Sequence, residues 1–276
     1  MDGDGVDMTE VSESFIDVPG GHLYRRTQGE GRDVVLFNAG AADLRMWDST
    51  VAWLAGIARV TSFDYRDTGL SSIAADPYSE IEDVAAVLAD AGVRDAVLVG
   101  VSDGARRCLA FTHRYPAAVA RVVAVAGAFG EFPDPSPEES GSRVEMREHF
   151  ARLEKVLAAD GLTARAEGDI DGWAPALDAH QRRKMVGLQV ANAYWVELVD
   201  YLGAELDPPV KHRFAELAAP VSVLVGGLDF LSTRLWARRI ADQVPGATLT
   251  VFEDADHFPM LSAPERFERY LRDVLA

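Results

Sequence analysis

Short apolar runs that alternate with longer amphipathic stretches limit, more than any other feature, what this chain can fold into. Six of the runs are rich in β-branched residues: DVVLFN (33–38), ARVTSFD (58–64), DAVLVGV (95–101), ARVVAVAG (120–127), PVSVLVGG (220–227) and ATLTVFE (247–253). A strand that is apolar along its whole length is typically buried on both faces, as in a parallel sheet covered by helices. The turn PGG between SFIDV and HLYRRTQ predicts an antiparallel hairpin ahead of them. We therefore expect the α/β fold class, with a mostly parallel, doubly wound sheet.

The alternation of strands and helices is interrupted once, between about residues 131 and 219. This segment opens with the proline-rich EFPDPSPEESG and continues with helical patterns, and it holds no convincing strand. We interpret residues 131–219 as a helical cap, or lid, over the carboxyl edge of the sheet. Residues 15–130 and 220–276 would then form the core domain, and the acidic residues 1–14 a mobile tail.

The end of the chain carries the clearest helical pattern. In SAPERFERYLRDVLA, apolar side chains recur at the spacing of one helix face: Phe267, Tyr270, Leu271, Val274 and Leu275. Ser262 and Glu265 have the spacing of a capping box, and Pro264 suits the first turn of a helix. We expect a final helix that begins at a reciprocal cap between Ser262 and Glu265.

Composition and charge exclude several classes of protein. A chain of 276 residues that is 48% hydrophobic can build one large α/β domain with a lid. Its net charge of -17 opposes binding to DNA, RNA or an anionic membrane, because contacts to phosphate dominate such affinities. The single cysteine, Cys108, cannot form an internal disulfide bond, and no apolar run approaches the ~20 residues of a membrane span. Without the apolar segment of a secretory signal, the chain is expected to be cytoplasmic, with a small-molecule substrate as its partner and an oligomeric state that the sequence leaves open.

A serine between two glycines follows one of the buried runs. The hexapeptide GVSDGA (100–105) joins the strand DAVLVGV to the helical stretch DGARRCLAFTHRYP. The pattern G-x-S-x-G typically forms a sharp strand-to-helix turn that lifts the serine out of the fold, and its small residues let backbone pass close by. Ser102 is therefore a candidate nucleophile.

Two further candidates follow later strands. In an open parallel sheet, ligands bind outside the carboxyl ends of the strands, so residues directly after a strand are the serious candidates. Asp229 follows the strand of PVSVLVGGLDFLS, and His257 follows the strand of ATLTVFEDADHFPML. Nucleophile, acid and base occur in this chain order around such a turn.

These residues and their surroundings resemble the α/β-hydrolase superfamily, in the branch with a serine nucleophile and a helical cap between the sixth and seventh strands. The resemblance covers nearly the whole chain, from about Phe15 to Ala276. Besides GVSDGA, it rests on segments similar to the family's loop after the third strand, its D-x-R-G-x-G-x-S turn, its acid loop and its histidine loop: VLFNAGAADLRMWD, FDYRDTGLSS, GGLDFLS and DADHFPMLSAPERF.

The resemblance implies acyl transfer without a metal or an organic cofactor. The expected reaction is hydrolysis of an ester, lactone, thioester or related bond of a small to medium apolar carbonyl substrate, through an acyl-enzyme on Ser102. His257 would act as the general base toward Ser102, and Asp229 would orient the imidazole and stabilise its protonated form. In FDYRDTGLSS, Asp64, Arg66 and Gly69 are interpreted as turn scaffold.

The oxyanion of the tetrahedral intermediate needs preorganised donors. These would be the backbone N–H groups of Asp103 and of Gly40, with Ala39 as an alternative to Gly40. Where the family usually has His-Gly in this loop, the chain has Asn38 and Ala39.

Two carboxylates near the expected site need their own interpretation. The side chain of Asp103 would oppose a developing oxyanion, so we expect it to pair with Arg106 or Arg107, three and four residues on. Glu131 is the fallback acid, because some members of the family carry the acid one strand earlier. We favour Asp229, whose loop matches the strand-turn pattern better.

The cap offers candidates for the wall of a pocket. Met185, Tyr194 and Trp195 could line it together with Asn38 and Ala39, although apolar residues at helical spacing more often serve packing. The remaining histidines show no ligand-like spacing, so no zinc site is expected. Two other kinds of function stay open: a non-hydrolytic enzyme of the same fold, such as a cyclase, lyase or perhydrolase, and a small-molecule receptor.

Overall fold

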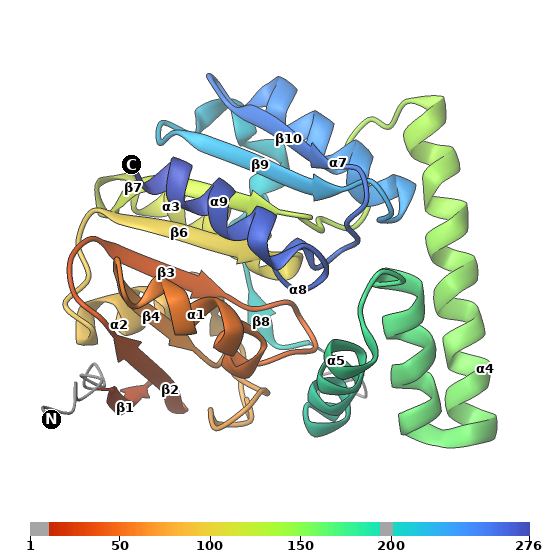
Figure 1. Ribbon diagram of the computed structural model, residues 1–276, viewed down its shortest axis with the longest axis horizontal. Helices are drawn as coiled ribbons and strands as arrows, with labels where there is room; N and C mark the ends of the chain where they lie inside the picture. The colour runs from red at the N-terminus through yellow and green to blue at the C-terminus, as the bar shows by residue number, and fades with distance from the viewer. Residues whose placement is uncertain (1–10, 194–200) are drawn as a thin grey trace, which may run out of the picture.

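An eight-stranded sheet runs through the centre of the protein in the computed structural model, which describes residues 11–193 and 201–276 (Figure 1). The strand order is β1-β2-β4-β3-β6-β7-β9-β10; β1 and β2 form an antiparallel hairpin, β2 is antiparallel to β4, and all other pairs are parallel. The strands are β1 (Ser12–Val18), β2 (Gly21–Gln28), β3 (Asp33–Phe37), β4 (Arg59–Phe63), β6 (Ala96–Val101), β7 (Val119–Val125), β9 (Val221–Gly226) and β10 (Thr248–Phe252). This is the predicted mostly parallel, doubly wound sheet.

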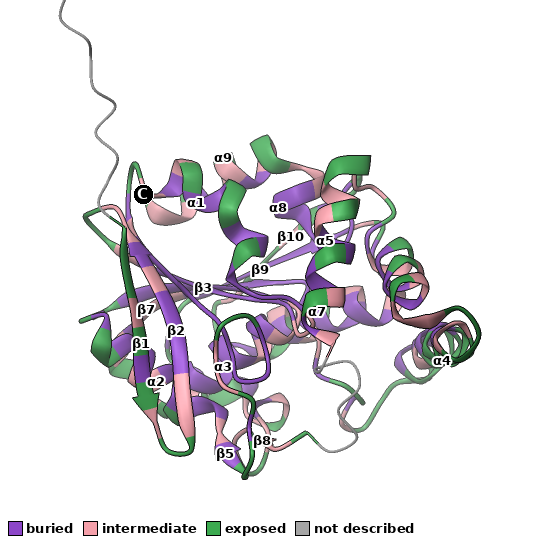
Figure 2. Ribbon diagram, turned by 90° about the horizontal axis from the view of Figure 1, so that it is seen from below, coloured by how far each residue is buried: buried purple, intermediate pink, exposed green. Residues whose placement is uncertain are grey.

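Helices cover both faces of the sheet. On one face lie α1 (Asp48–Leu54), α8 (Pro259–Ser262) and α9 (Pro264–Leu275); on the other lie α2 (Glu80–Asp90), α3 (Asp103–Arg114) and α7 (Leu231–Gln243) (Figure 2). Every residue of β6 and of β9 is buried, because these central strands lie between the two helical layers. Single 3-10 turns complete the layers: η1 (Leu44–Trp47), η2 (Pro116–Ala118), η3 (Val210–His212) and η4 (Phe214–Glu216).

The cap stands at the carboxyl ends of the parallel strands, between β7 and β9, which are the sixth and seventh strands of the large sheet (Figure 1). It contains α4 (Pro137–Trp173) and α5 (Ala179–Ala191). Gly161 divides α4 into an outer and an inner arm, because its φ of 84° and ψ of -176° interrupt the helix. Glycine reaches this backbone conformation without the steric cost that a Cβ imposes.

The six predicted strands agree with the observed ones to within two residues at each end. Two local features differ. β1 already begins at Ser12, inside the segment expected as a tail, and the two-residue strand β8 (Gly203–Ala204) pairs with β5 (Tyr78–Ser79) in a region expected to hold no strand. None of the helices in the described part of the chain is long and apolar enough to cross a membrane.

The expected capping box at the last helix is wrong. Ser262 is the final residue of α8, and its hydroxyl donates to the carbonyl of Phe258 and accepts from the backbone N–H of Asp256. Ala263 therefore takes the capping position of α9 without a side-chain hydrogen bond.

Candidate active site

Ser102 lies on the tight turn between β6 and α3. Its φ of 57° and ψ of -119° are unusual for a residue with a side chain, and such strain persists only where surrounding structure imposes it. Two close approaches explain the flanking glycines. A Cβ on Gly100 would lie 2.4 Å from the carbonyl oxygen of Gly104, and a Cβ on Gly104 would lie 2.5 Å from that of Phe37. The structure thus has the sharp strand-to-helix turn that the G-x-S-x-G pattern predicts.

His257 and Asp229 are joined by a hydrogen bond. The Nδ1 atom of His257, in the loop after β10, lies 2.7 Å from Oδ2 of Asp229, in the loop after β9. The two residues are 2% and 3% exposed, so water hardly competes for this contact. The other oxygen of Asp229 accepts from the backbone N–H of Phe230 at 2.7 Å, which fixes the carboxylate in place.

Ser102 and His257 border the same cavity of about 330 Å³. The core contributes one wall, and three segments of the cap contribute the other. The lining residues are Ala39, Gly40, Ala41, Ser102, Asp103, Phe150, Arg165, Asp169, Trp173, Gln189, His257 and Phe258. The cavity therefore has a reactive end in the core and both aromatic and charged side chains on the cap.

The backbone N–H group of Asp103, together with that of Gly40 or Ala39, could bind the oxyanion. Asp103 is the first residue of α3, and the first N–H groups of a helix have no partner within the helix. The partial positive charge of the helix N-terminus favours a negative group there. The N–H of Ala39 already donates to Sδ of Met46 at 3.3 Å, whereas Gly40 lines the cavity. This difference favours Gly40 over Ala39 as the second donor.

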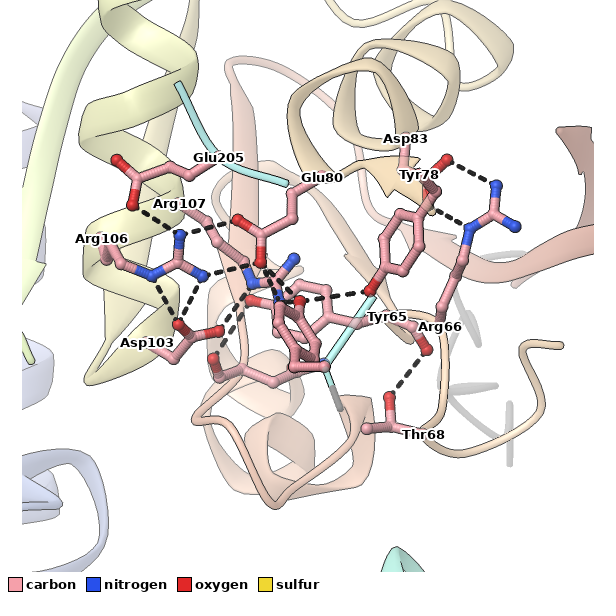
Figure 3. Close-up of polar contacts among 12 residues, drawn as sticks. Tyr65, Arg66, Thr68, Tyr78, Glu80, Asp83, Asp103, Arg106, Arg107 and Glu205 are labelled. Carbon is pink, nitrogen blue, oxygen red and sulfur yellow. Dashed lines mark hydrogen bonds and ion pairs between the residues drawn. The ribbon is translucent and has the colours of Figure 1, made fainter. Parts of the chain in front are cut away.

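The carboxylate of Asp103 is held by two arginines (Figure 3). Its Oδ1 lies 2.7 Å from Arg106 and its Oδ2 lies 2.7 Å from Nε of Arg107, so the expected pairing involves both residues. Burial alone would raise the pKa of Asp103, but the positive charges of Arg106 and Arg107 outweigh it and hold this pKa at about 2. The side chain next to Ser102 is therefore a carboxylate whose charge is locally neutralised.

The same arginines bind two acids from other segments, as the dashed lines in Figure 3 trace. Glu80, the first residue of α2, is 1% exposed and lies 2.7 Å from Arg106 and 3.0 Å from Arg107. Glu205, which directly follows β8, lies 3.0 Å from Arg106. This buried network connects the helix that begins at the candidate nucleophile with α2 and with the end of the inserted segment.

A hydrogen bond and a ring contact join the loop that carries His257 to the cap. The Asp256 carboxylate, which is fully buried, accepts from the backbone N–H groups of Phe258 and Ala176, each at 3.0 Å. The Trp173 ring packs against the His257 imidazole, with ring centroids 4.4 Å apart and the ring planes tilted by 46°. The position of the imidazole therefore depends on the cap as well as on Asp229.

Several predicted residues lie elsewhere. Asn38 is buried and donates to the carbonyl of Phe63, and Met185 is buried in the core; neither lines the cavity. Tyr194 and Trp195 lie outside the described residues. The side chain of the fallback acid, Glu131, is 68% exposed and pairs with Arg143, so it is Asp229 that contacts the imidazole.

The D-x-R turn is a structural element, as expected. The two oxygens of Asp64 accept from the backbone N–H groups of Leu44 and Leu70, each at 2.9 Å, and burial raises the pKa of Asp64 to about 6. Arg66 pairs with Asp83 at 2.7 Å. These contacts hold the loop that follows β4.

Within the described residues, no group of three or more His, Cys, Asp or Glu side chains is placed to hold a metal ion.

Sequence reasoning missed the cap wall of the cavity, chiefly Arg165, Asp169 and Gln189. All three are buried, although they are polar. One signal was present in the sequence. Arg165 and Asp169 are four residues apart, and each directly precedes an apolar residue, Ala166 or Ile170, so they lie near the side of the helix that faces the interior.

Known proteins resemble this chain over nearly its whole length. The pimeloyl-acyl-carrier-protein methyl ester esterase of Pectobacterium atrosepticum is 28% identical over 259 residues, which cover 89% of this chain and 95% of that protein. Among solved structures, the esterase EaEST from Exiguobacterium antarcticum has a TM-score of 0.78 at 19% identity and covers 95% of this chain and 99% of its own. Est816, an N-acyl homoserine lactone degrading enzyme, has a TM-score of 0.73 at 24% identity, with coverages of 94% and 99%.

The model of the alpha/beta hydrolase family matches residues 34–270, which include the elbow at Ser102, the whole cap and the loops of Asp229 and His257. The strand order and the position of the helical insertion agree with this match. The chain therefore belongs to the alpha/beta hydrolase family.

Proposed function

We propose that the protein is a serine esterase or lactonase in which Ser102 is the nucleophile, His257 the general base and Asp229 the partner of the imidazole. The observation that carries this proposal is the 2.7 Å contact between His257 and Asp229 beside a cavity that Ser102 also lines. A serine hydroxyl is a poor nucleophile at neutral pH, and a neighbouring imidazole held in one tautomer removes this weakness.

The reaction would proceed in two halves. The Oγ atom of Ser102 attacks the substrate carbonyl carbon while its proton passes to Nε2 of His257, and the carbonyl electrons move onto oxygen. The N–H groups of Asp103 and Gly40 stabilise this oxyanion, each worth about 3–4 kcal/mol of the barrier. The intermediate collapses, and the leaving alcohol takes the proton from His257. Water, activated by the same imidazole, then releases the acid from Ser102.

The ion pairs of Asp103 suit this mechanism. An unpaired carboxylate beside the oxyanion would raise the energy of the transition state. Arg106 and Arg107 hold the carboxylate of Asp103 and compensate its charge. The backbone N–H of Asp103 therefore remains available for the oxyanion.

The substrate class follows from the relatives. The curated relative is a methyl ester esterase, and the similar structures include an esterase and a lactone-degrading enzyme. Each of these reactions acts on an ester or lactone carbonyl, which is a bond that an activated serine can attack. A small ester or lactone is accordingly the substrate that we assign to this cavity.

The proposal can be tested with a fluorophosphonate, which labels activated serines. Mass spectrometry should find the label on Ser102 of the wild type and not in Ser102→Ala, and labelling should be much slower in His257→Ala. Turnover of p-nitrophenyl esters should fall in both variants by several orders of magnitude. A wild-type protein that neither reacts with the probe nor turns over any ester would contradict the proposal and favour a receptor or a non-hydrolytic reaction.

A further inference from the structure

We propose that the cavity selects esters or lactones that also carry a carboxylate, and that Arg165 of the cap binds this group. This inference rests on the proposed esterase function of the same cavity, and it names the kind of acyl group that fits there. The sequence led to the expectation of an apolar substrate, and this proposal adds a carboxylate to it.

Arg165 is a buried cation without a counter-ion among the residues that the structure describes. It lies on the inner arm of α4, is 8% exposed and lines the cavity that Ser102 and His257 also line. Its Nε atom is buried without a hydrogen-bond partner, and across residues 11–193 and 201–276 its guanidinium forms no ion pair. A buried charge that lacks a partner raises the free energy of the folded protein. A ligand that supplies the missing acceptor recovers this free energy when it binds.

Two carboxylates also line the cavity, and both already have partners: Asp103 is paired with Arg106 and Arg107, and Asp169 with two residues of the cap. Asp169, one helical turn after Arg165, places Oδ1 3.1 Å from Nε2 of His149 and accepts at Oδ2 from Nε2 of Gln189 at 2.8 Å. His149 and Gln189 are themselves buried, so these contacts hold Asp169 on its own side of the cap. Among the described residues no ion pair joins Asp169 to Arg165, so the guanidinium remains available to a molecule in the cavity.

The chemistry of arginine points to a carboxylate. The planar guanidinium presents its donors in a fork that matches the two oxygens of a carboxylate, and such charge-assisted pairs are about twice as strong as neutral hydrogen bonds. The net charge of -17 repels an anion at long range, but at physiological ionic strength this field is screened beyond ~8 Å. Within the cavity, the carboxylates of Asp103 and Asp169 are bound to other residues, and the guanidinium of Arg165 offers the donors that they do not use.

The test compares three matched methyl esters in a series from succinate to adipate: the half-ester with a free carboxylate, the dimethyl ester, and the ester amide that has nearly the shape of the half-ester but no charge. For the chain length that fits best, the wild type should turn over the half-ester with a kcat/KM at least about 10-fold above both neutral esters. The substitution Arg165→Gln should lower kcat/KM for the half-ester by about 10- to 100-fold and change the value for the dimethyl ester less than about 3-fold. Arg165→Lys should lie between, because it keeps the charge without the fork.

The matched control is Arg152→Gln, which removes an exposed arginine from the outer arm of the same helix and should leave all three esters unaffected. Fluorophosphonate labelling of Ser102 reports the state of the nucleophile independently of Arg165. Equal turnover of charged and neutral esters by a labelled wild-type protein, or an equal loss on all three esters in Arg165→Gln, would overturn the carboxylate assignment and leave the esterase intact. A wild type that is not labelled and has no turnover would overturn both.

Discussion

The backbone N–H of His257 donates a hydrogen bond of 3.2 Å to the carbonyl of Trp173, the last residue of α4. The candidate general base is thus bonded at its main chain to the cap and at its side chain to Asp229 in the core. A cap that only shielded the cavity would need no such bond. Here the inserted helices also take part in positioning the imidazole.

Substitution of the fully buried Asp256 tests the connection between the His257 loop and the cap. In Asp256→Ala the N–H groups of Phe258 and Ala176 lose their acceptor, and we expect the free energy of unfolding to fall by about 2–4 kcal/mol. Ester turnover should also fall, since the loop beside His257 is no longer tied to the cap. Chemical denaturation and kcat measure the two effects. Asp254→Ala is the matched control: its exposed ion pair with Arg266 should contribute little, and a similar loss in both variants would contradict the argument.

The assignment of Asp229 leads to a second prediction. Asp229→Asn should lower kcat by about 10³–10⁴-fold, because an amide at this position stabilises the wrong tautomer of His257. The fold should be retained, as judged by circular dichroism. Glu131→Gln, at the fallback acid, should keep wild-type kcat because its side chain pairs with Arg143 away from the imidazole. A large loss in Glu131→Gln with a small one in Asp229→Asn would reverse the assignment.

The ion pairs of Asp103 predict how stability depends on pH. The pKa of Asp103 is about 2 in the folded protein and 3.8 for an ordinary aspartate, so the folded state favours the carboxylate. Its stabilising contribution, on the order of 2 kcal/mol, is present above pH 4 and is lost as the pH falls through 2. The difference in unfolding free energy between wild type and Asp103→Asn should be constant from pH 8 to 5 and shrink below pH 4. A difference that stays constant down to pH 2 would contradict this, and the exposed Asp242→Asn serves as the control.

The interruption of α4 at Gly161 predicts opposite changes in stability for two Gly→Ala substitutions in this helix. Among the described residues, nothing beyond the adjacent backbone lies within 4 Å of a Cβ placed on Gly161 or on Gly141, so packing does not distinguish the two glycines. Gly161→Ala places a side chain at a φ of 84° and should destabilise the protein by about 1–3 kcal/mol. Gly141→Ala, within the outer arm, should stabilise it by about 0.5–1 kcal/mol. Denaturant titrations of both variants measure this contrast, and stabilisation by both would mean that α4 runs through residue 161 as one helix.

Local sequence patterns predicted the sheet and the candidate triad for physical reasons. A strand buried on both faces must be apolar throughout, which makes β6 and β9 visible in the sequence. Residues that follow such strands necessarily meet at one sheet edge, and the contact between Asp229 and His257 is a consequence.

Two pairs of Ser and Glu with the same spacing form different structures because their tertiary contacts differ. Ser136 and Glu139 form a capping box at the start of α4, with each side chain bonded to the backbone of the other residue. Ser262 and Glu265 have the same spacing, but the preceding turn of α8 already uses the Ser262 hydroxyl. The spacing of Arg165 indicates which side of its helix it occupies, but the way in which Arg165 and Gln189 reach one cavity depends on how two helices pack, which no local period encodes.

The buried charges around Arg106 have a consequence for protein engineering. Glu205 belongs in sequence to the inserted segment, yet its carboxylate is bound to the helix that begins at Ser102. A chimera that exchanges the cap with that of a relative and rejoins the chain anywhere after Glu205 would therefore remove an acid from this network and leave Arg106 partly uncompensated. The Tyr201 hydroxyl also belongs to this network, because it accepts a hydrogen bond of 2.6 Å from Arg107. The crossover point for such a graft therefore lies before Tyr201, so that the host keeps both Tyr201 and Glu205. The segment that can be exchanged is therefore shorter than the whole segment between the sixth and seventh strands.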